Sequence, residues 1–354
     1  MADLFAEKYS LLALLGQGGM CEVYRARQLL FDRQVAIKIL RRSLALSPES
    51  RQRFLREARN CARLDHPAII TIYDVDEWEE RPYIAMQFID GGSLEGLIDK
   101  GLNALRGVEI MADVADALAC AHEIEVAHRD LKPDNILIAS DGRVKVADWG
   151  LAKCLDGAQD LTHAGVVLGT PEYMSPEQIM SKPLSMKSDL YSLGVLLYEV
   201  LTGSLPFETE TMTDLLQAHI YNEPTPIKSH APYIPQPLAN LVIELLAKEP
   251  DERPQSAKHV AVILEKVAAE FGEELNEHLV KRKRTTGATP TSPNVGTEKT
   301  SGELRSSKRS TKKNLQELTA SGRPTVRIFS KKARVLMLLF IILFIALLVY
   351  WRSQ

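Results

Sequence analysis

The order of two hydrophobic patterns along the chain constrains its fold more than any other feature of the sequence. Short β-rich runs come first, such as QVAIKIL at 34–40 and PYIAMQFI at 82–89, and longer helical patterns follow, such as 107–124 and 237–248. A helix is also predicted between the early strands, at 53–64, from its apolar periodicity. Strands first and helices afterwards favour an α+β fold of two lobes, a small β-rich one and a larger helical one.

The globular pattern ends at about residue 271, where the composition changes. We therefore predict a folded domain at 9–271, with its first lobe at about 9–89 and its second at about 90–271. Residues 281–334 hold 15 Lys and Arg, only 3 Asp and Glu, and 16 Ser and Thr, without apolar periodicity. Such a segment cannot bury enough surface to order a core, so we expect a disordered linker there.

Charge and cysteine usage exclude several classes of protein. The net charge of −3 combines the basic tail with an acidic body, which disfavours nucleic-acid binding by that body. The cysteines form no C-x-x-C pairs, so neither a zinc site nor a disulfide framework is expected. The first residues, MADLFAEKYS, lack the apolar stretch of a secretory signal, so no such signal is expected.

A glycine-rich stretch, LGQGGMCEVYRA at 15–26, is the first candidate for a phosphate site. Alone it is weak, because a glycine cluster between two strands is more often only a hairpin turn. The order of later residues strengthens it. Lys38 ends the β-branched run VAIK, and Glu57 lies on the predicted helix. A lysine and a glutamate on separate elements can pair, and the ammonium group is then directed at phosphate oxygens.

A second group of polar residues lies in HRDLKPDN at 128–135 and in VADWG further along. Asn135 and Asp148 offer the oxygen ligands that Mg²⁺ prefers. Asp130 can accept a hydrogen bond from an incoming hydroxyl, and Lys132 supplies positive charge beside a phosphoryl group. Phosphoryl transfer requires positioned charge and metal more than covalent chemistry, so these residues predict that reaction.

Together with GTPEYMSPEQ at 169–178, these motifs resemble the eukaryotic-type protein kinases over about residues 9–271. The chain is most similar to the bacterial membrane-anchored serine/threonine kinases of that family. The resemblance implies ATP as phosphoryl donor and Mg²⁺ as cofactor, with Mn²⁺ as a substitute. It implies serine and threonine hydroxyls of proteins as acceptors, and a transient homodimer for autophosphorylation.

The resemblance also assigns roles by position. Catalytic roles fall on Asp130, Lys132, Lys38, its helix partner Glu57, and Thr170, which would touch Asp130 and Lys132. The Mg²⁺ ligands would be Asn135 and Asp148. Met86 would be the gatekeeper of the adenine pocket, with backbone groups of Gln87 and Ile89 hydrogen-bonded to the base. The rest of the ATP site would comprise Leu15, Gly16, Gln17, Gly18, Gly19, Val23, Ala36 and Leu137.

Three structural roles follow in the same way. Glu177 would pair with Arg253, and Asp189 would brace the backbone of the catalytic loop. Arg129, directly before Asp130, requires an anionic partner, and a phosphate on Thr162 would supply it. An unmodified hydroxyl at Thr162 remains the alternative.

The sequence departs from the family pattern at three positions. Cys21 replaces the third loop glycine, Trp149 replaces the phenylalanine after the metal aspartate, and Ser175 replaces the alanine of the S-P-E motif. None of the three would touch the proton, the metal or the phosphate, so we expect a working site. Trp149 should keep an apolar ring stacked with the other members of its cluster, namely His128, Cys61 and Ile72.

The apolar run VLMLLFIILFIALLVYW at 335–351 carries no charge. As a helix it would span about 26 Å, near the lower limit for a bilayer core of about 30 Å. Three basic residues precede it and one follows, which predicts a single-pass C-terminal anchor with the kinase domain on the cytoplasmic side of a bacterial inner membrane. The basic linker either provides solubility or is attracted to anionic lipid headgroups, and the sequence favours neither.

Two other functions remain to be weighed. A pseudokinase scaffold at the membrane is disfavoured because Lys38, Glu57, Asp130, Asn135 and Asp148 are all present. A kinase of small metabolites is disfavoured by the complete peptide-docking segment at 169–177.

Overall fold

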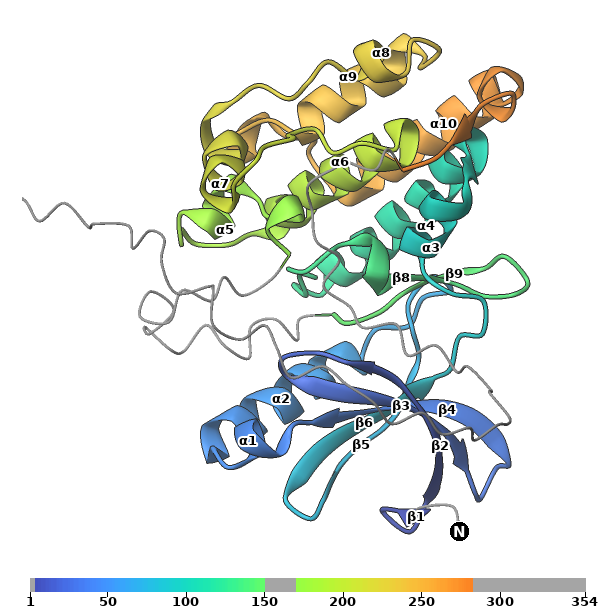
Figure 1. Ribbon diagram of the computed structural model, residues 1–354, viewed down its shortest axis with the longest axis vertical. Helices are drawn as coiled ribbons and strands as arrows, with labels where there is room; N and C mark the ends of the chain where they lie inside the picture. Colours follow the sequence, from blue (N-terminus) through green and yellow to red (C-terminus); the bar gives the residue numbers. More distant parts are fainter. Residues whose placement is uncertain (1–3, 150–169, 283–354) are drawn as a thin grey trace, which may run out of the picture. The chain divides into compact units, whose positions relative to one another are not determined.

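The computed structural model describes residues 4–149 and 170–282, and all of them belong to one compact unit (Figure 1). Thr162, the linker from residue 283 onward and the apolar run at 335–351 lie outside the described residues. Within the described part of the chain, no helix has both the length and the apolar character needed to cross a bilayer.

The first lobe is an antiparallel sheet of six strands in the order β1-β2-β3-β4-β6-β5. Its central strands are rich in β-branched and apolar residues, and their side chains are buried from Val35 to Leu40 and from Pro82 to Met86. These strands therefore form the core of the lobe. The strands are β1 (Leu4–Phe5), β2 (Tyr9–Gln17), β3 (Cys21–Gln28), β4 (Arg33–Leu40), β5 (Ile72–Trp78) and β6 (Arg81–Gln87).

Two helices, α1 (Arg42–Ala45) and α2 (Pro48–Cys61), lie between β4 and β5 in the chain and beside the sheet (Figure 1). The helix predicted at 53–64 is thus present, but α2 begins and ends earlier. The reason is local: the hydroxyl of Ser47 accepts a hydrogen bond from the backbone N–H of Ser50, and Pro48 stands in the first turn. Both features are start signals for a helix.

The second lobe is helical and is built around α4 and α6. Helix α6 is buried from Ser188 to Thr202, so it forms the centre of the lobe. The helices are α3 (Leu94–Lys100), α4 (Ala104–Glu123), α5 (Pro176–Ile179), α6 (Met186–Thr202), α7 (Met212–Tyr221), α8 (Ile227–His230), α9 (Gln236–Leu245) and α10 (Ala257–Asn276). Two short strand pairs complete it: β7 (Leu102–Asn103) with β10 (Leu279–Val280), and β8 (Ile136–Ile138) with β9 (Val144–Val146).

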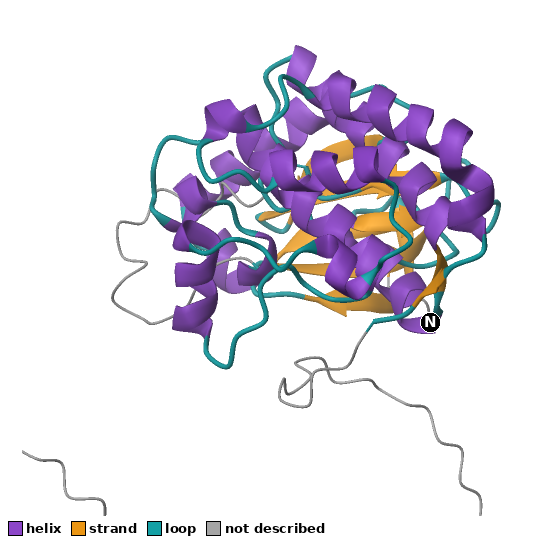
Figure 2. Ribbon diagram, turned by 90° about the horizontal axis from the view of Figure 1, so that it is seen from above, coloured by secondary structure: helices purple, strands orange, loops and turns teal. Residues whose placement is uncertain are grey.

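The predicted α+β architecture of two lobes is confirmed (Figure 2). The strand β6 of the first lobe ends at Gln87, and the helix α3 of the second lobe begins at Leu94. The chain therefore passes from one lobe to the other between these two residues.

The folded part continues beyond residue 271, because Leu275 on α10 and Val280 on β10 are buried in the core of the second lobe. The carbonyl oxygen of Lys281 occupies the place that a Cβ at Gly203 would need, so only glycine permits this course of the chain.

Candidate active site

The glycine-rich stretch forms the hairpin between β2 and β3. Gly16 lies opposite Val23 and Gln17 opposite Glu22, and the N–H of Gly18 closes the turn on the carbonyl oxygen of Cys21 at 2.9 Å. A Cβ at Gly16 or Gly19 would meet no described residue within 4 Å, so packing in the described part of the chain does not require these glycines. The open space beside their backbone fits a ligand that approaches the loop closely.

The apolar residues expected around adenine lie together. Val23, Ala36, Met86, Ile89 and Leu137 belong to one apolar cluster, to which both lobes contribute. Strand register places Ala36 directly opposite Met86. The fit to a flat apolar base is therefore good. Leu15, at the end of β2 before the glycines, is about half exposed at 49%.

One of the backbone groups at the end of β6 already forms a hydrogen bond within the protein. The N–H of Gln87 donates to the carbonyl oxygen of Thr71 at 2.9 Å. An adenine could therefore use the carbonyl oxygen of Gln87 and the N–H of Ile89, but not the N–H of Gln87.

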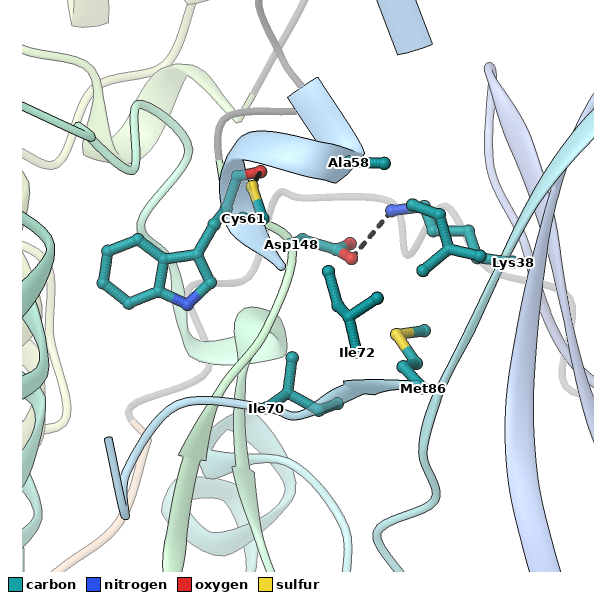
Figure 3. A pocket seen from close by; sticks show the side chains of 9 residues that line it. Lys38, Ala58, Cys61, Ile70, Ile72, Met86 and Asp148 are labelled. Carbon is teal, nitrogen blue, oxygen red and sulfur yellow. Dashed lines mark hydrogen bonds and ion pairs between the residues drawn. The ribbon is translucent and has the colours of Figure 1, made fainter. Parts of the chain in front are cut away.

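Lys38 forms an ion pair with Asp148: its Nζ lies 2.7 Å from Oδ1 (Figure 3). The side chain of Lys38 is only 10% exposed and that of Asp148 33%. Burial disfavours both charges, but each supplies the counter-charge of the other. As a result the pKa of Lys38 is raised and the pKa of Asp148 is lowered from their usual values.

The pair expected between Lys38 and Glu57 is not formed in this conformation. The carboxylate of Glu57 lies 3.5 Å from the guanidinium of its neighbour Arg56, while Lys38 pairs with Asp148. Lys38 is buried and needs an anion at contact distance, and Asp148 meets that need without Glu57. A small pocket of about 20 Å³, roughly the space of one water molecule, lies at the pair. Its lining consists of Lys38 and Asp148 themselves together with Ala58, Cys61, Ile70, Ile72, Ile84, Met86 and Trp149 (Figure 3).

The expected catalytic residues of the second lobe lie in contact with one another. The Nζ of Lys132 lies 2.9 Å from Oδ2 of Asp130 and donates to Oγ1 of Thr170 at 3.0 Å. The side-chain amide of Asn135 donates to the carbonyl oxygen of Asp130 at 2.7 Å and to its Oδ2 at 3.2 Å. A carboxylate, an ammonium and a hydroxyl are thus fixed within hydrogen-bond reach of one another.

Asp189 holds the backbone of this loop in place. Its carboxylate accepts the N–H groups of His128 and Arg129, each at 2.8 Å, and contacts Nε2 of His122 at 2.8 Å. Arg129 has a φ of +69°, in the left-handed region that costs energy for a side chain of its size. Burial would raise the pKa of Asp189, but the hydrogen bond from His122 and the nearby positive groups outweigh it and lower that pKa.

Arg129 carries a polar group without a partner. Its Nε is buried and makes no hydrogen bond among the described residues, while its carbonyl oxygen accepts from the side chain of Gln178 at 2.8 Å. A buried guanidinium N–H without an acceptor is costly, so this atom is suited to an anion from outside the described part of the chain.

Trp149 lies in the cluster that was expected for it. The ring is 2% exposed, lies 4.9 Å from the ring of His128 and donates from Nε1 to the carbonyl oxygen of Val146 at 3.0 Å. The thiol of Cys61 donates to its carbonyl oxygen at 2.9 Å, and Ile72 lines the adjoining pocket.

Glu177 and Arg253 form a two-pronged ion pair, with N–O distances of 2.7 and 2.9 Å. The hydroxyl of Ser188 also donates to Glu177 at 2.7 Å, and the side chain of Arg253 is fully buried. The start of α5 is thereby fixed to the end of the 3-10 turn at Pro250–Glu252. Ser175, the residue that departs from the motif, caps α5 in a capping box with Gln178.

The residues present fit a magnesium ion. Among the described residues no group of three or more His, Cys, Asp or Glu could hold a metal, so a metal here would be held by Asn135 and Asp148 together with ligands from outside the protein. Because Asn135 donates from its amide nitrogen to Asp130, its amide oxygen is left to act as a ligand. Amide and carboxylate oxygens are hard ligands, and a phosphate would have to complete the coordination.

Two supporting residues escaped the sequence analysis, His122 and Gln178. Gln178 on α5 contacts the catalytic loop directly at Arg129, and His122 on α4 supports the loop through Asp189. No local pattern marks them, because their role depends on tertiary contacts alone.

Known proteins resemble the chain over the whole of this site. Residues 9–263 match the family described as the protein kinase domain. The serine/threonine-protein kinase PknB of Mycolicibacterium smegmatis is 41% identical over 270 residues, which are 74% of this chain and 43% of that protein. The serine/threonine-protein kinase PrkC of Bacillus subtilis is 39% identical over 253 residues, 71% of this chain and 39% of that protein. The match thus spans less than half the length of these relatives.

Solved structures show the same fold. The crystal structure of the Mycobacterium tuberculosis PknI kinase domain superimposes with a TM-score of 0.60 at 26% identity, over 75% of this chain and 98% of that domain.

The Lys38–Asp148 pair predicts that two variants lose activity alike but differ in the free energy of unfolding. Lys38→Met leaves a largely buried carboxylate unpaired and should lower the free energy of unfolding by about 1–3 kcal/mol. Glu57→Gln, which leaves that pair intact, should change it by less than about 0.5 kcal/mol. Both variants should lose phosphoryl transfer. Urea unfolding without nucleotide, alongside a transfer assay, checks this; equal destabilisation by the two variants would contradict it.

Proposed function

The chain belongs to the protein kinase family, and on that premise we propose that it transfers the γ-phosphoryl group of ATP to serine and threonine hydroxyls of proteins. The observation that carries the proposal is the convergence of Asp130, Lys132 and Thr170 within hydrogen-bond distance beside Asn135. The similar proteins named as serine/threonine kinases support the choice of acceptor.

Each group in the site would have one task. Bound Mg²⁺ would neutralise charge on the phosphates, and Asn135 and Asp148 would hold it. Asp130 would accept the hydrogen bond of the incoming hydroxyl and take its proton. Lys132 would stabilise negative charge on the transferring group, and Thr170 holds the ammonium of Lys132 in position.

The conformation described here would be a resting one. Lys38 and Asp148 now neutralise each other, so neither is fully free for phosphate or metal. In the working state Lys38 would turn to the phosphates and Glu57 would replace Asp148 as its partner. This exchange would require a movement of α2, the helix that carries Glu57.

Two further features belong to the proposal. A phosphate on Thr162, added by a second copy of the chain, would meet the buried Nε of Arg129.

A helix at 335–351 would anchor the chain in the membrane, with the kinase domain on the cytoplasmic side. The pseudokinase alternative has no support in the site, because Asp130, Lys132 and Asn135 lie within hydrogen-bond distance there and Lys38 and Asp148 are paired.

The catalytic role is tested at Asp130. Asp130→Asn removes the proton acceptor and should slow phosphoryl transfer to a protein substrate by about 10²–10⁴-fold, with nucleotide binding retained. Asp141→Asn, in the exposed turn between β8 and β9, is the matched control and should keep full activity. Radiolabelled ATP measures transfer, and undiminished turnover of the Asp130 variant would refute the assignment.

The proposed switch is tested at Thr162. Thr162→Ala should lower activity on an added substrate by about tenfold, because Arg129 loses a charge-assisted partner. Thr162→Ser keeps a hydroxyl that can be phosphorylated and should retain activity. Mass spectrometry of the active protein should find phosphate on residue 162. Its absence there, with a fully active alanine variant, would exclude this switch.

The proposed anchor is tested by extraction. Full-length protein should remain in the membrane pellet after alkaline carbonate treatment, and a chain lacking 335–354 should be released. The truncated chain should phosphorylate a soluble peptide at the same rate but phosphorylate its own copies more slowly, since anchoring raises local concentration. A full-length chain released by carbonate would contradict the anchor.

A further inference from the structure

The backbone of Asp148, one of the two expected metal ligands, is strained. Its φ is +63°, in the left-handed region that costs energy for a residue with a side chain. A residue keeps such a conformation only where its surroundings hold it from several sides. The hydrogen bonds of the neighbouring peptide groups therefore indicate what keeps the carboxylate of Asp148 directed at the site.

The peptide group before Asp148 is held by the catalytic loop. The N–H of Ala147 donates to the carbonyl oxygen of Asn135 at 2.8 Å, and the carbonyl oxygen of Ala147 lies 2.9 Å from Nε2 of His128. Because Nδ1 of His128 accepts the N–H of Asp130 at 3.4 Å, Nε2 carries the proton and is the donor. These contacts fix the chain up to Asp148 but not beyond it.

Two polar side chains hold the residue after Asp148. Nε1 of Trp149 donates to the carbonyl oxygen of Val146 at 3.0 Å, and the thiol of Cys61 donates to the carbonyl oxygen of Trp149 at 2.9 Å. The first bond connects the residues on either side of Asp148 and so closes its backbone into a short loop. Phenylalanine at position 149 or an aliphatic residue at position 61 could make neither bond.

The indole bond constrains the backbone without being needed to satisfy its acceptor. The carbonyl oxygen of Val146 also accepts the N–H of Ile70 at 3.0 Å, so it remains paired if the indole N–H is removed. The ring of Trp149 is 2% exposed and contacts the ring of His128, which a phenyl ring could also do. Loss of the N–H alone would therefore release Asp148 without leaving a buried acceptor unpaired.

The thiol bond connects the metal aspartate to a different element, the helix α2. Cys61 is the last residue of α2, four residues after Glu57, so the two side chains lie on the same face of the helix. A movement of α2 that brings Glu57 to Lys38 would also displace the thiol and the carbonyl group that it holds. The position of α2 and the backbone of Asp148 are thus linked by one hydrogen bond.

Building on the proposed function, we propose that Cys61 and Trp149 are positioning residues for the metal ion. Their hydrogen bonds hold the backbone of Asp148 in the conformation in which its carboxylate can bind Mg²⁺. Neither residue touches the metal, the nucleotide or the reacting atoms. Loss of either bond lowers the fraction of chains that are ready to bind the metal, and the apparent affinity for Mg²⁺ falls by the same factor.

Nucleotide binding tests this without phosphoryl transfer. A fluorescent, non-hydrolysable ATP analogue is added to the full-length chain, and Mg²⁺ is titrated to find its half-saturating concentration. Trp149→Phe and Cys61→Ala should each raise that concentration by about 2–10-fold, the value of one net hydrogen bond. The affinity for the analogue in EDTA should not change.

Two further variants exclude a purely structural explanation. Cys61→Ser keeps a hydrogen-bond donor and should return the half-saturating Mg²⁺ concentration to within about twofold of the unmodified chain. Cys120→Ala removes the thiol on α4 that lies 3.8 Å from the carbonyl oxygen of Asp65, and should leave that concentration unchanged. Urea unfolding of all variants gives their stability. A Mg²⁺ requirement that simply follows the free energy of unfolding, or that is equal in Cys61→Ser and Cys61→Ala, would overturn the proposal.

The outcomes separate this inference from the proposed function. A raised Mg²⁺ requirement in both variants of a chain that transfers no phosphoryl group would leave the positioning role standing and refute the kinase activity. Phosphoryl transfer by the unmodified chain, with an unaltered Mg²⁺ requirement in the variants, would refute the positioning role alone. Nucleotide binding that does not respond to Mg²⁺ would also overturn that role.

Discussion

The geometry of the catalytic loop depends on one buried carboxylate, that of Asp189. It accepts two consecutive backbone N–H groups and a histidine nitrogen, and so compensates the left-handed backbone at Arg129. An isolated backbone in that conformation would relax, and the side chain of Asp130 would lose its fixed direction. The helix α6 that carries Asp189 is itself buried from Ser188 to Thr202, which makes this support rigid. The fixed direction of the Asp130 side chain thus depends on the packed core of the second lobe.

In the first lobe, the feature that matters for function is which carboxylate pairs with Lys38. Lys38 is positioned by the strand β4 and pairs with Asp148. In the proposed working state, Glu57 on α2 would replace Asp148 as its partner. Under that proposal the second lobe fixes the chemistry, and the first lobe regulates access to it.

The sequence predicted the fold and the composition of the site well, because its motifs are local and their order is specific. Asp130, Lys132, Thr170 and Asn135 are brought together as expected, and Glu177 meets Arg253 across a long stretch of chain. It did not indicate that Lys38 pairs with Asp148 in this conformation, because the distance from Lys38 to Glu57 depends on how α2 packs. It also missed the ordered course of Lys281 and Arg282: the linker composition suggested disorder from residue 281, whereas a strand pair and a glycine contact hold its first residues. Such long-range contacts leave no periodicity to detect.

The close approach of Lys281 to Gly203 has an evolutionary consequence. Gly203 ends α6 in a left-handed conformation, with a φ of +71°. Any side chain there would both strain that turn and displace the segment that crosses it. Positions 203 and 279–282 therefore cannot vary independently. In homologous chains, a glycine at the end of this helix should accompany a tail that follows the same course, and a bulkier residue should mark a tail that leaves the domain by another route.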